Sequence, residues 1–183
     1  MRSKLLKVTL FGFLLLNANE ASSASCSKKL KKAFTSSFLA HQQGGCYQAN
    51  RCQMNVYYFV KKNNYSKDSR RYKVLLLTPT KEANIPHVQS LTRNAYGIPW
   101  QYHFILQFDG HIYDFDFGDI PTPISASKYF EAFYPDTSDL LITSFSFIEY
   151  IEFMENGLSL EDAIAETQSA AIPYSEFIQE APL

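Results

Sequence analysis

Sparse cysteine, glycine and proline exclude three classes of protein for this chain. Its 183 residues contain only 3 Cys, 7 Gly and 8 Pro. Three cysteines cannot build a disulfide-rich scaffold, and so little glycine and proline excludes collagen-like and low-complexity sequences. Basic residues are not in excess either, because 17 Lys and Arg face 18 Asp and Glu. Nucleic-acid-binding proteins normally carry such an excess, so we expect no nucleic-acid partner.

The N-terminal residues have the layout of a secretory signal peptide. Three positive charges come first, at Arg2, Lys4 and Lys7. An apolar run over 8–16 and a small-residue stretch over 21–24 follow. This run is too short for a membrane span, so we expect cleavage after Ala24. An uncleaved anchor and a lipoprotein signal ending at Cys26 are the alternatives.

The rest of the chain has no second long apolar run, internal repeat or Pro/Gly linker. We therefore expect a single soluble domain over 25–183, secreted or periplasmic, monomeric and without stable membrane association. Periodicity and capping signals predict helices over 27–40, 51–62, 146–155 and 159–170. Strands are expected over 72–78, 100–108, 111–117 and 140–143, with a loop-rich connection over 79–99. This order favours an α+β fold.

Cys52 lies in the first turn of the helix expected after Asn50, which is a good N-cap residue. Free backbone N–H groups and the positive end of the helix dipole favour a thiolate there, and the thiolate is the nucleophilic form. Cys52 is therefore a candidate nucleophile. A buried inert cysteine and a Cys46–Cys52 disulfide are the alternatives.

A hairpin supplies the partners that a catalytic cysteine needs. Asp109-Gly110 between apolar runs predicts a two-residue turn, which sets Phe108 opposite His111. The same register sets His103 opposite Asp116, and side-chain alternation puts His103, Asp114 and Asp116 on one face. A carboxylate beside an imidazole fixes its tautomer and stabilises its cation. A purely structural His–Asp pair is the alternative.

No other feature of the sequence indicates a cofactor. His41, His87 and His111 stand apart from other ligand-type residues, so spacing predicts no metal site. Phosphate-binding and dinucleotide fingerprints are missing, because Gly110 and Gly118 are isolated. We therefore expect neither a metal nor an organic cofactor.

Four short motifs resemble those of the protein N-terminal glutamine amidohydrolase family. They are Cys52-Gln53-Met54-Asn55, Trp100-Gln101-Tyr102-His103, Tyr113-Asp114-Phe115-Asp116 and Ile120-Pro121-Thr122-Pro123. Weaker likeness extends to 146–153 and 174–178. The resemblance implies a papain-like α+β fold, in which a helix carrying the cysteine packs on an antiparallel sheet carrying His and Asp.

The resemblance also implies the chemistry, namely conversion of a glutamine carboxamide to glutamate with release of ammonia. It assigns the catalytic roles to Cys52, His103 and Asp114, and Asp116 is the reserve acid. Gln48, Asn55 and Gln101 are candidates for stabilising the oxyanion or binding substrate. We expect a Gln-bearing peptide or protein as the partner.

Several readings of this site remain open from the sequence. The family's acidic positions next to the cysteine and the histidine are Gln53, Met54 and Gln101 here, so an internal glutamine is an alternative substrate to an N-terminal one. The same three residue types also serve cysteine proteases and transglutaminase-like enzymes. A secreted binding module without catalysis is the non-enzymatic alternative, and a Cys26–Cys46 disulfide is a further expectation in an oxidising compartment.

Overall fold

The computed structural model describes residues 28–43, 47–48, 51–63, 71–80, 87–88, 98–99, 102–116, 123–134, 136–156 and 159–180. The chain divides into two compact units, 1–37 and 38–183. In the first unit, the described residues 28–37 are helical, and the described residues 38–43 of the second unit are helical as well. The predicted signal peptide and its cleavage position lie outside the described residues.

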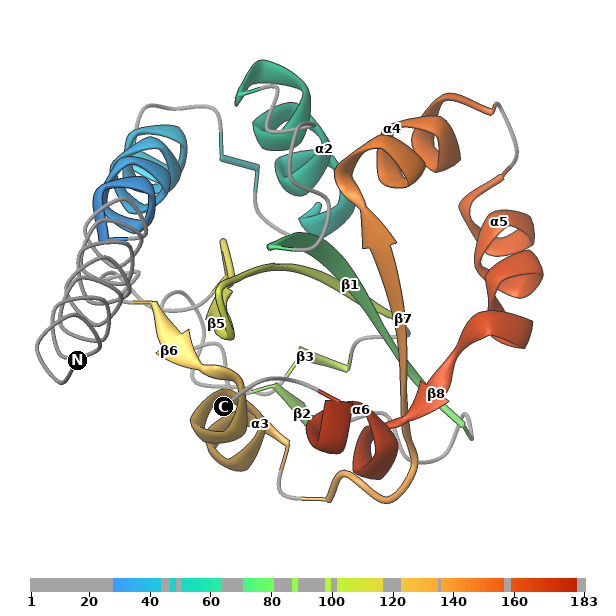
Figure 1. Ribbon diagram of the computed structural model, residues 1–183. Coiled ribbons are helices and arrows are strands. Elements are labelled where there is room, and N and C mark those ends of the chain that lie inside the picture. The colour runs from blue at the N-terminus through green and yellow to red at the C-terminus, as the bar shows by residue number, and fades with distance from the viewer. Residues whose placement is uncertain are drawn as a thin grey trace, which may run out of the picture. The chain divides into compact units, whose positions relative to one another are not determined.

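The second unit is built on a six-stranded antiparallel sheet in the order β6-β5-β4-β1-β7-β8 (Figure 1). Its strands are β1 (Tyr72–Pro79), β4 (His103–Phe108), β5 (His111–Tyr113), β6 (Ile124–Ser125), β7 (Leu140–Ser146) and β8 (Ile172–Pro173). Two further short strands, β2 (His87–Val88) and β3 (Ile98–Pro99), pair with each other. The helices are α2 (Cys52–Asn63), α3 (Ala126–Phe133), α4 (Phe147–Glu155), α5 (Leu160–Thr167) and α6 (Tyr174–Glu180), with a 3₁₀ turn, η2 (Gln168–Ala170), after α5.

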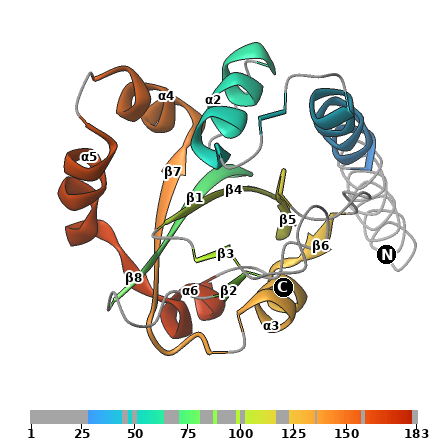
Figure 2. The same cartoon turned by 180° about the vertical axis from the view of Figure 1, so that it is seen from behind.

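Helices cover both faces of the central strands. In the two opposed views, α2 and α4 lie on one side and α3 and α6 on the other (Figures 1 and 2). Leu75 and Leu77 of β1 pack with α3 and α6 in one apolar core, because alternate side chains of a strand point to the same face. Val74 and Leu76, which point to the opposite face of β1, are also buried, so β1 is covered on both faces. The α+β prediction is confirmed.

The predicted hairpin is confirmed in its turn and in its register. Phe108 pairs with His111 and Leu106 with Tyr113, as the two-residue loop requires. Asp109 and Gly110 have φ angles of 48° and 70°, and positive φ at both positions defines the turn type that matches the strand twist. The pairing stops at Tyr113, because β5 ends there rather than at residue 117.

The helix after Cys52 and the capped helix after Ser146 are also confirmed, each to within one residue at its ends. At Ser146 the hydroxyl accepts from the Glu149 backbone N–H, and the Glu149 carboxylate accepts from the Ser146 backbone N–H. Two helices are not predicted from the sequence, α3 and α6, which are 8 and 7 residues long. Helices this short carry a weak periodic signal and depend on tertiary packing.

Among the described residues, none of the helices has the length and hydrophobicity that a membrane span needs.

We expect Gly110→Ala to destabilise the protein, because a Cβ atom at φ 70° clashes with the backbone. The cost should be about 1 kcal/mol in the free energy of unfolding, measured by urea denaturation. Gly110→Asn is the matched control, since asparagine tolerates this conformation and should retain most of the stability. Equal stability of the Ala and Asn variants would contradict this account of the turn.

Candidate active site

Cys52 is the first residue of α2. The Asn55 backbone N–H donates to the Arg51 carbonyl at 3.0 Å, so Arg51 occupies the N-cap position. The sequence had placed the cap at Asn50, which lies outside the described residues. The Cys52 side chain is buried, and its thiol lies 3.7 Å from the Gln53 side-chain carbonyl oxygen. The unpaired N–H groups of this first turn make it a favourable place for an anion.

Asn55 holds the segment that precedes the helix. Its carboxamide accepts from the Gln48 backbone N–H and donates to the Gln48 carbonyl, each at 2.8 Å, and the side chain is fully buried. The structure therefore shows that Asn55 holds this segment, and its part in binding substrate stays a prediction. Gln48 is fixed through its backbone and is exposed, so its side chain remains available as an oxyanion donor.

His103 and Asp114 form a buried pair. The His103 Nε2 atom lies 2.8 Å from Asp114 Oδ2, and both side chains are shielded from solvent. His103 is the first residue of β4, and Asp114 follows the last residue of β5. The two ends of one hairpin therefore bring the imidazole and the carboxylate together.

The Asp114 carboxylate is held from two further directions. The Tyr129 hydroxyl of α3 donates to Oδ2 at 2.6 Å, and the Asp116 backbone N–H donates to Oδ1 at 2.9 Å. Burial raises the pKa of Tyr129 well above its usual range, with a further contribution from the Asp114 charge, so its hydroxyl remains a donor. A carboxylate that accepts several hydrogen bonds is stabilised in its charged form.

Opposed effects set the charge states of the pair. Burial alone would lower the pKa of His103, but the Asp114 carboxylate and hydrogen bond raise it well above 6.5. Hydrogen bonding and charge at Cys52 raise the pKa of His103 further. Burial would raise the pKa of Asp114, yet the His103 charge and the hydrogen bonds lower it below 3.8. The pair is therefore an imidazolium and a carboxylate.

Asp116 plays a different part from Asp114. Continuing the strict hairpin register would have set Asp116 opposite His103, but β5 ends at Tyr113 and the chain turns away from the ladder. The hydrogen-bond partner of His103 is therefore Asp114. One Asp116 carboxylate oxygen accepts from the Tyr47 hydroxyl.

The same turn creates a cluster that spacing did not indicate. His103, Asp114 and Asp116 are all buried, and one ligand-type atom from each lies within 4.8 Å of the others. Such atoms could hold a metal ion. Both oxygens of Asp114, however, already accept hydrogen bonds, and one of these comes from Nε2 of His103. The arrangement thus fits a hydrogen-bonded dyad better than a metal site.

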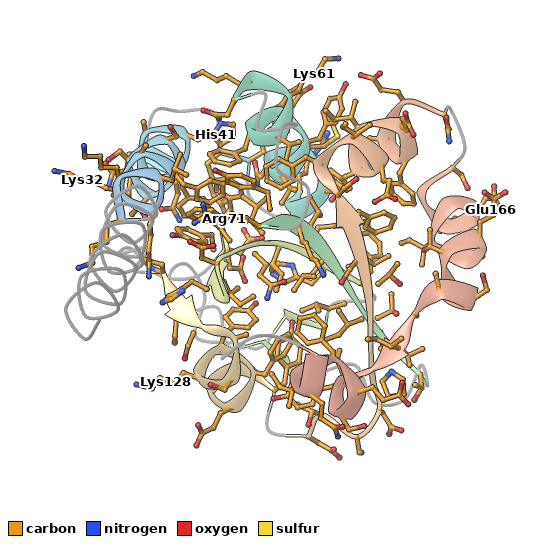
Figure 3. All side chains as sticks on the ribbon, in the orientation of Figure 1. Lys32, His41, Lys61, Arg71, Lys128 and Glu166 are labelled. Carbon is orange, nitrogen blue, oxygen red and sulfur yellow. The ribbon has the colours of Figure 1, made fainter. Side chains whose placement is uncertain are left out.

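The remaining candidates lie elsewhere. Gln101, Cys26 and Cys46 are outside the described residues. His41 is buried against the Phe59 and Phe115 rings, and neither of its ring nitrogens has a hydrogen-bond partner among the described residues (labelled in Figure 3). Burial lowers the pKa of His41, with a further contribution from Lys62, so its ring is neutral. His111 Nδ1 donates to the Asp109 carbonyl at 2.8 Å.

The supporting tyrosines were not found from the sequence. Tyr129 contacts the site through a hydroxyl on a helix that was not predicted. Tyr150 of α4 donates to the Gln53 carbonyl at 2.7 Å and thereby holds the first turn of α2. The chain has 12 tyrosines, and nothing in their spacing marks these two.

No model of a known protein family matches the chain, and no curated protein matches its sequence.

The charged pair should give the protein a characteristic pH dependence of stability. The pKa of Asp114 is lowered from 3.8, so its contribution is present above that value and is lost as the pH falls further. The pKa of His103 is raised from 6.5, so its contribution is complete below that value and is lost at higher pH. The stability lost in Asp114→Asn, measured by urea unfolding, should be largest between these two values. A loss that does not vary with pH would contradict the pairing.

Proposed function

We propose that the protein is a cysteine-dependent amidohydrolase that converts glutamine in a peptide or protein to glutamate. The observation that carries the proposal is that α2, which begins with Cys52, packs on β4, which begins with His103, while Asp114 holds the His103 ring. A nucleophile next to a base that is oriented by a third group is the signature of covalent hydrolysis. The packing of α2 against β4 supports a papain-like arrangement.

In the first step, the Cys52 thiolate attacks the carboxamide carbon of glutamine. Asp114 holds Nε2 of His103, so Nδ1 is the nitrogen that carries the proton between the thiol and the substrate. Nδ1 protonates the departing nitrogen, the C–N bond breaks, and ammonia leaves. The acyl group remains on Cys52 as a thioester.

In the second step, His103 takes a proton from water, which attacks the thioester. The C–S bond breaks, glutamate is released, and the proton returns to the thiolate–imidazole pair. The developing oxyanion needs fixed donors, and the backbone N–H of Cys52 at the open end of α2 is well placed to supply one. Gln48 and Gln101 are the candidates for a second.

The motif resemblance supports a glutamine carboxamide over a peptide bond, and an N-terminal glutamine over an internal one. The Gln53 and Gln101 positions are neutral, so the carboxylate that would hold a free α-amine is missing there, which favours the internal glutamine. The layout of the N-terminus makes a secreted or periplasmic enzyme part of the proposal. Matched peptides with N-terminal or internal glutamine separate the two substrates.

Incubation with a Gln peptide should yield ammonia and a peptide about 1 Da heavier, since a carboxylic acid replaces a carboxamide through the thioester. Cys52→Ala should abolish this conversion while leaving the far-UV circular dichroism unchanged, because the nucleophile is lost but the helix is kept. Cys46→Ala is the matched control and should retain activity. Loss of activity in Cys46→Ala but not in Cys52→Ala would refute the assignment, and a shortened peptide would indicate a protease.

Asp114→Asn should lower kcat by on the order of 10⁴ with little change in KM, because an amide cannot stabilise the His103 cation. Asp116→Asn is the control and should cost far less, since that carboxylate accepts from Tyr47. Steady-state kinetics of both variants on one Gln peptide measure the difference. Near-normal turnover by Asp114→Asn would remove Asp114 from the mechanism.

A further inference from the structure

A concave site that does not include Cys52 is lined by residues of α4, α5 and β7. It is a cleft of about 370 Å³. The two helices that contribute to its lining, α4 and α5, are neighbours in both views (Figures 1 and 2). The residues that matter for its chemistry are three glutamates, two aromatic rings and one hydroxyl: Glu149, Glu152, Glu166, Phe145, Phe153 and Thr143. No lysine, arginine or histidine is among its lining residues.

The charge of this region is strongly one-sided. Residues 129–183 contain 11 acidic residues and no Lys, Arg or His. Glu155, just outside the cleft, has a basic partner, with its carboxylate 2.7 Å from the Lys61 ammonium. Within the described part of the chain, Glu152 and Glu166 have no basic partner, and both are exposed (Glu166 is labelled in Figure 3). The cleft therefore has uncompensated negative charge.

Two helix ends add to this negative potential. The cleft is lined by Glu152 in the last turn of α4 and Asn156 at its C-cap, and by Glu166 and Thr167 in the last turn of α5. The carbonyl end of a helix is its negative end, and neither helix has a basic residue in its last turn. Both the fixed dipoles and the side chains thus favour a cation.

A largely buried threonine forms part of the cleft wall. The Thr143 side chain is only 4% exposed, and it lines the cleft together with Phe145, which lies on the same face of β7. Among the described residues, no group forms a hydrogen bond with this hydroxyl. The hydroxyl oxygen itself is not sealed off from solvent, so it is open to the cleft, where it can accept a hydrogen bond from a ligand N–H.

The aromatic part of the wall suits an alkyl chain. The Phe145 and Phe153 rings pack with their centroids 5.2 Å apart. Lysine and arginine combine an apolar stem with a charged head, so the stem can lie on such rings while the head meets the carboxylates.

We propose that this cleft binds a lysine or arginine side chain of the protein substrate, and so selects substrates with a basic segment near the target glutamine. The role in substrate selection rests on the proposed function, whereas binding of the cation does not. The cleft and the nucleophile share one framework, because Tyr150 of α4 ties that helix to the Gln53 carbonyl beside Cys52.

Binding is tested on the Cys52→Ala protein with a fluorescent, lysine-rich peptide that contains no glutamine. Glu152→Gln/Glu166→Gln should weaken binding roughly fivefold to tenfold at low ionic strength, and added salt should shrink the difference. Glu131→Gln/Glu176→Gln makes the same change in net charge on exposed residues outside the cleft, and it should alter binding by less than about twofold. Thr143→Val keeps the side-chain shape but removes the hydroxyl, and it should weaken binding about threefold.

Two binding results would overturn the proposal. One is no binding of the lysine-rich peptide at low salt, and the other is that Glu152→Gln/Glu166→Gln and Glu131→Gln/Glu176→Gln weaken binding equally.

Kinetics separate this proposal from the catalytic one. On a Gln peptide that carries lysines, Glu152→Gln/Glu166→Gln should raise KM and leave kcat unchanged. On a neutral Gln peptide, the variant should change neither KM nor kcat. If no peptide is deamidated, the catalytic proposal fails while the binding result still decides the cleft. If both peptides are deamidated with equal KM by the wild type, the cleft proposal fails alone.

Discussion

The site depends on one interaction, the buried hydrogen bond between His103 and Asp114. Two charged groups out of contact with water are costly unless each is paired and its remaining hydrogen-bonding capacity is satisfied. Here the Tyr129 hydroxyl and the Asp116 backbone N–H supply the extra bonds to the carboxylate. The hairpin turn, the end of β5 and the position of α3 all serve this pairing, because each brings one of these groups to Asp114. Removing any one of them leaves a buried charge without part of its support.

The same pairing explains how the other elements are arranged around Cys52. With Nε2 of His103 occupied by Asp114, the rest of the ring can serve the thiol at the start of α2. That helix start is fixed from two sides, by the Asn55 clamp on Gln48 and by the Tyr150 hydroxyl on the Gln53 carbonyl. Rigid support of this kind matters because misplacement of a catalytic group by about 1 Å can cost on the order of 10²-fold in rate.

Local signals were enough to predict the elements that carry the site. An Asp-Gly pair between apolar runs predicted the hairpin register, and a Ser-x-x-Glu capping-box motif predicted the start of α4. What failed depended on where elements stop and on contacts between distant segments. The register could not show that β5 ends at Tyr113, and that ending decides between Asp114 and Asp116. The sequence could not show that Asn55 holds the Gln48 backbone, because the position of that segment is set by tertiary contacts. Tyr129 could not be found because α3 is too short to show a helical period.

The account makes Cys52 a nucleophile whose reactivity depends on His103, and covalent labelling tests this most directly. The reagent is a glutamine-like peptide in which a chloromethyl ketone replaces the carboxamide, so that a thiolate displaces chloride and forms a stable thioether. Intact mass and peptide mapping should show one label per protein, on Cys52, forming much more slowly in His103→Ala. A label on Cys26 or Cys46, or an unchanged labelling rate in His103→Ala, would contradict the account.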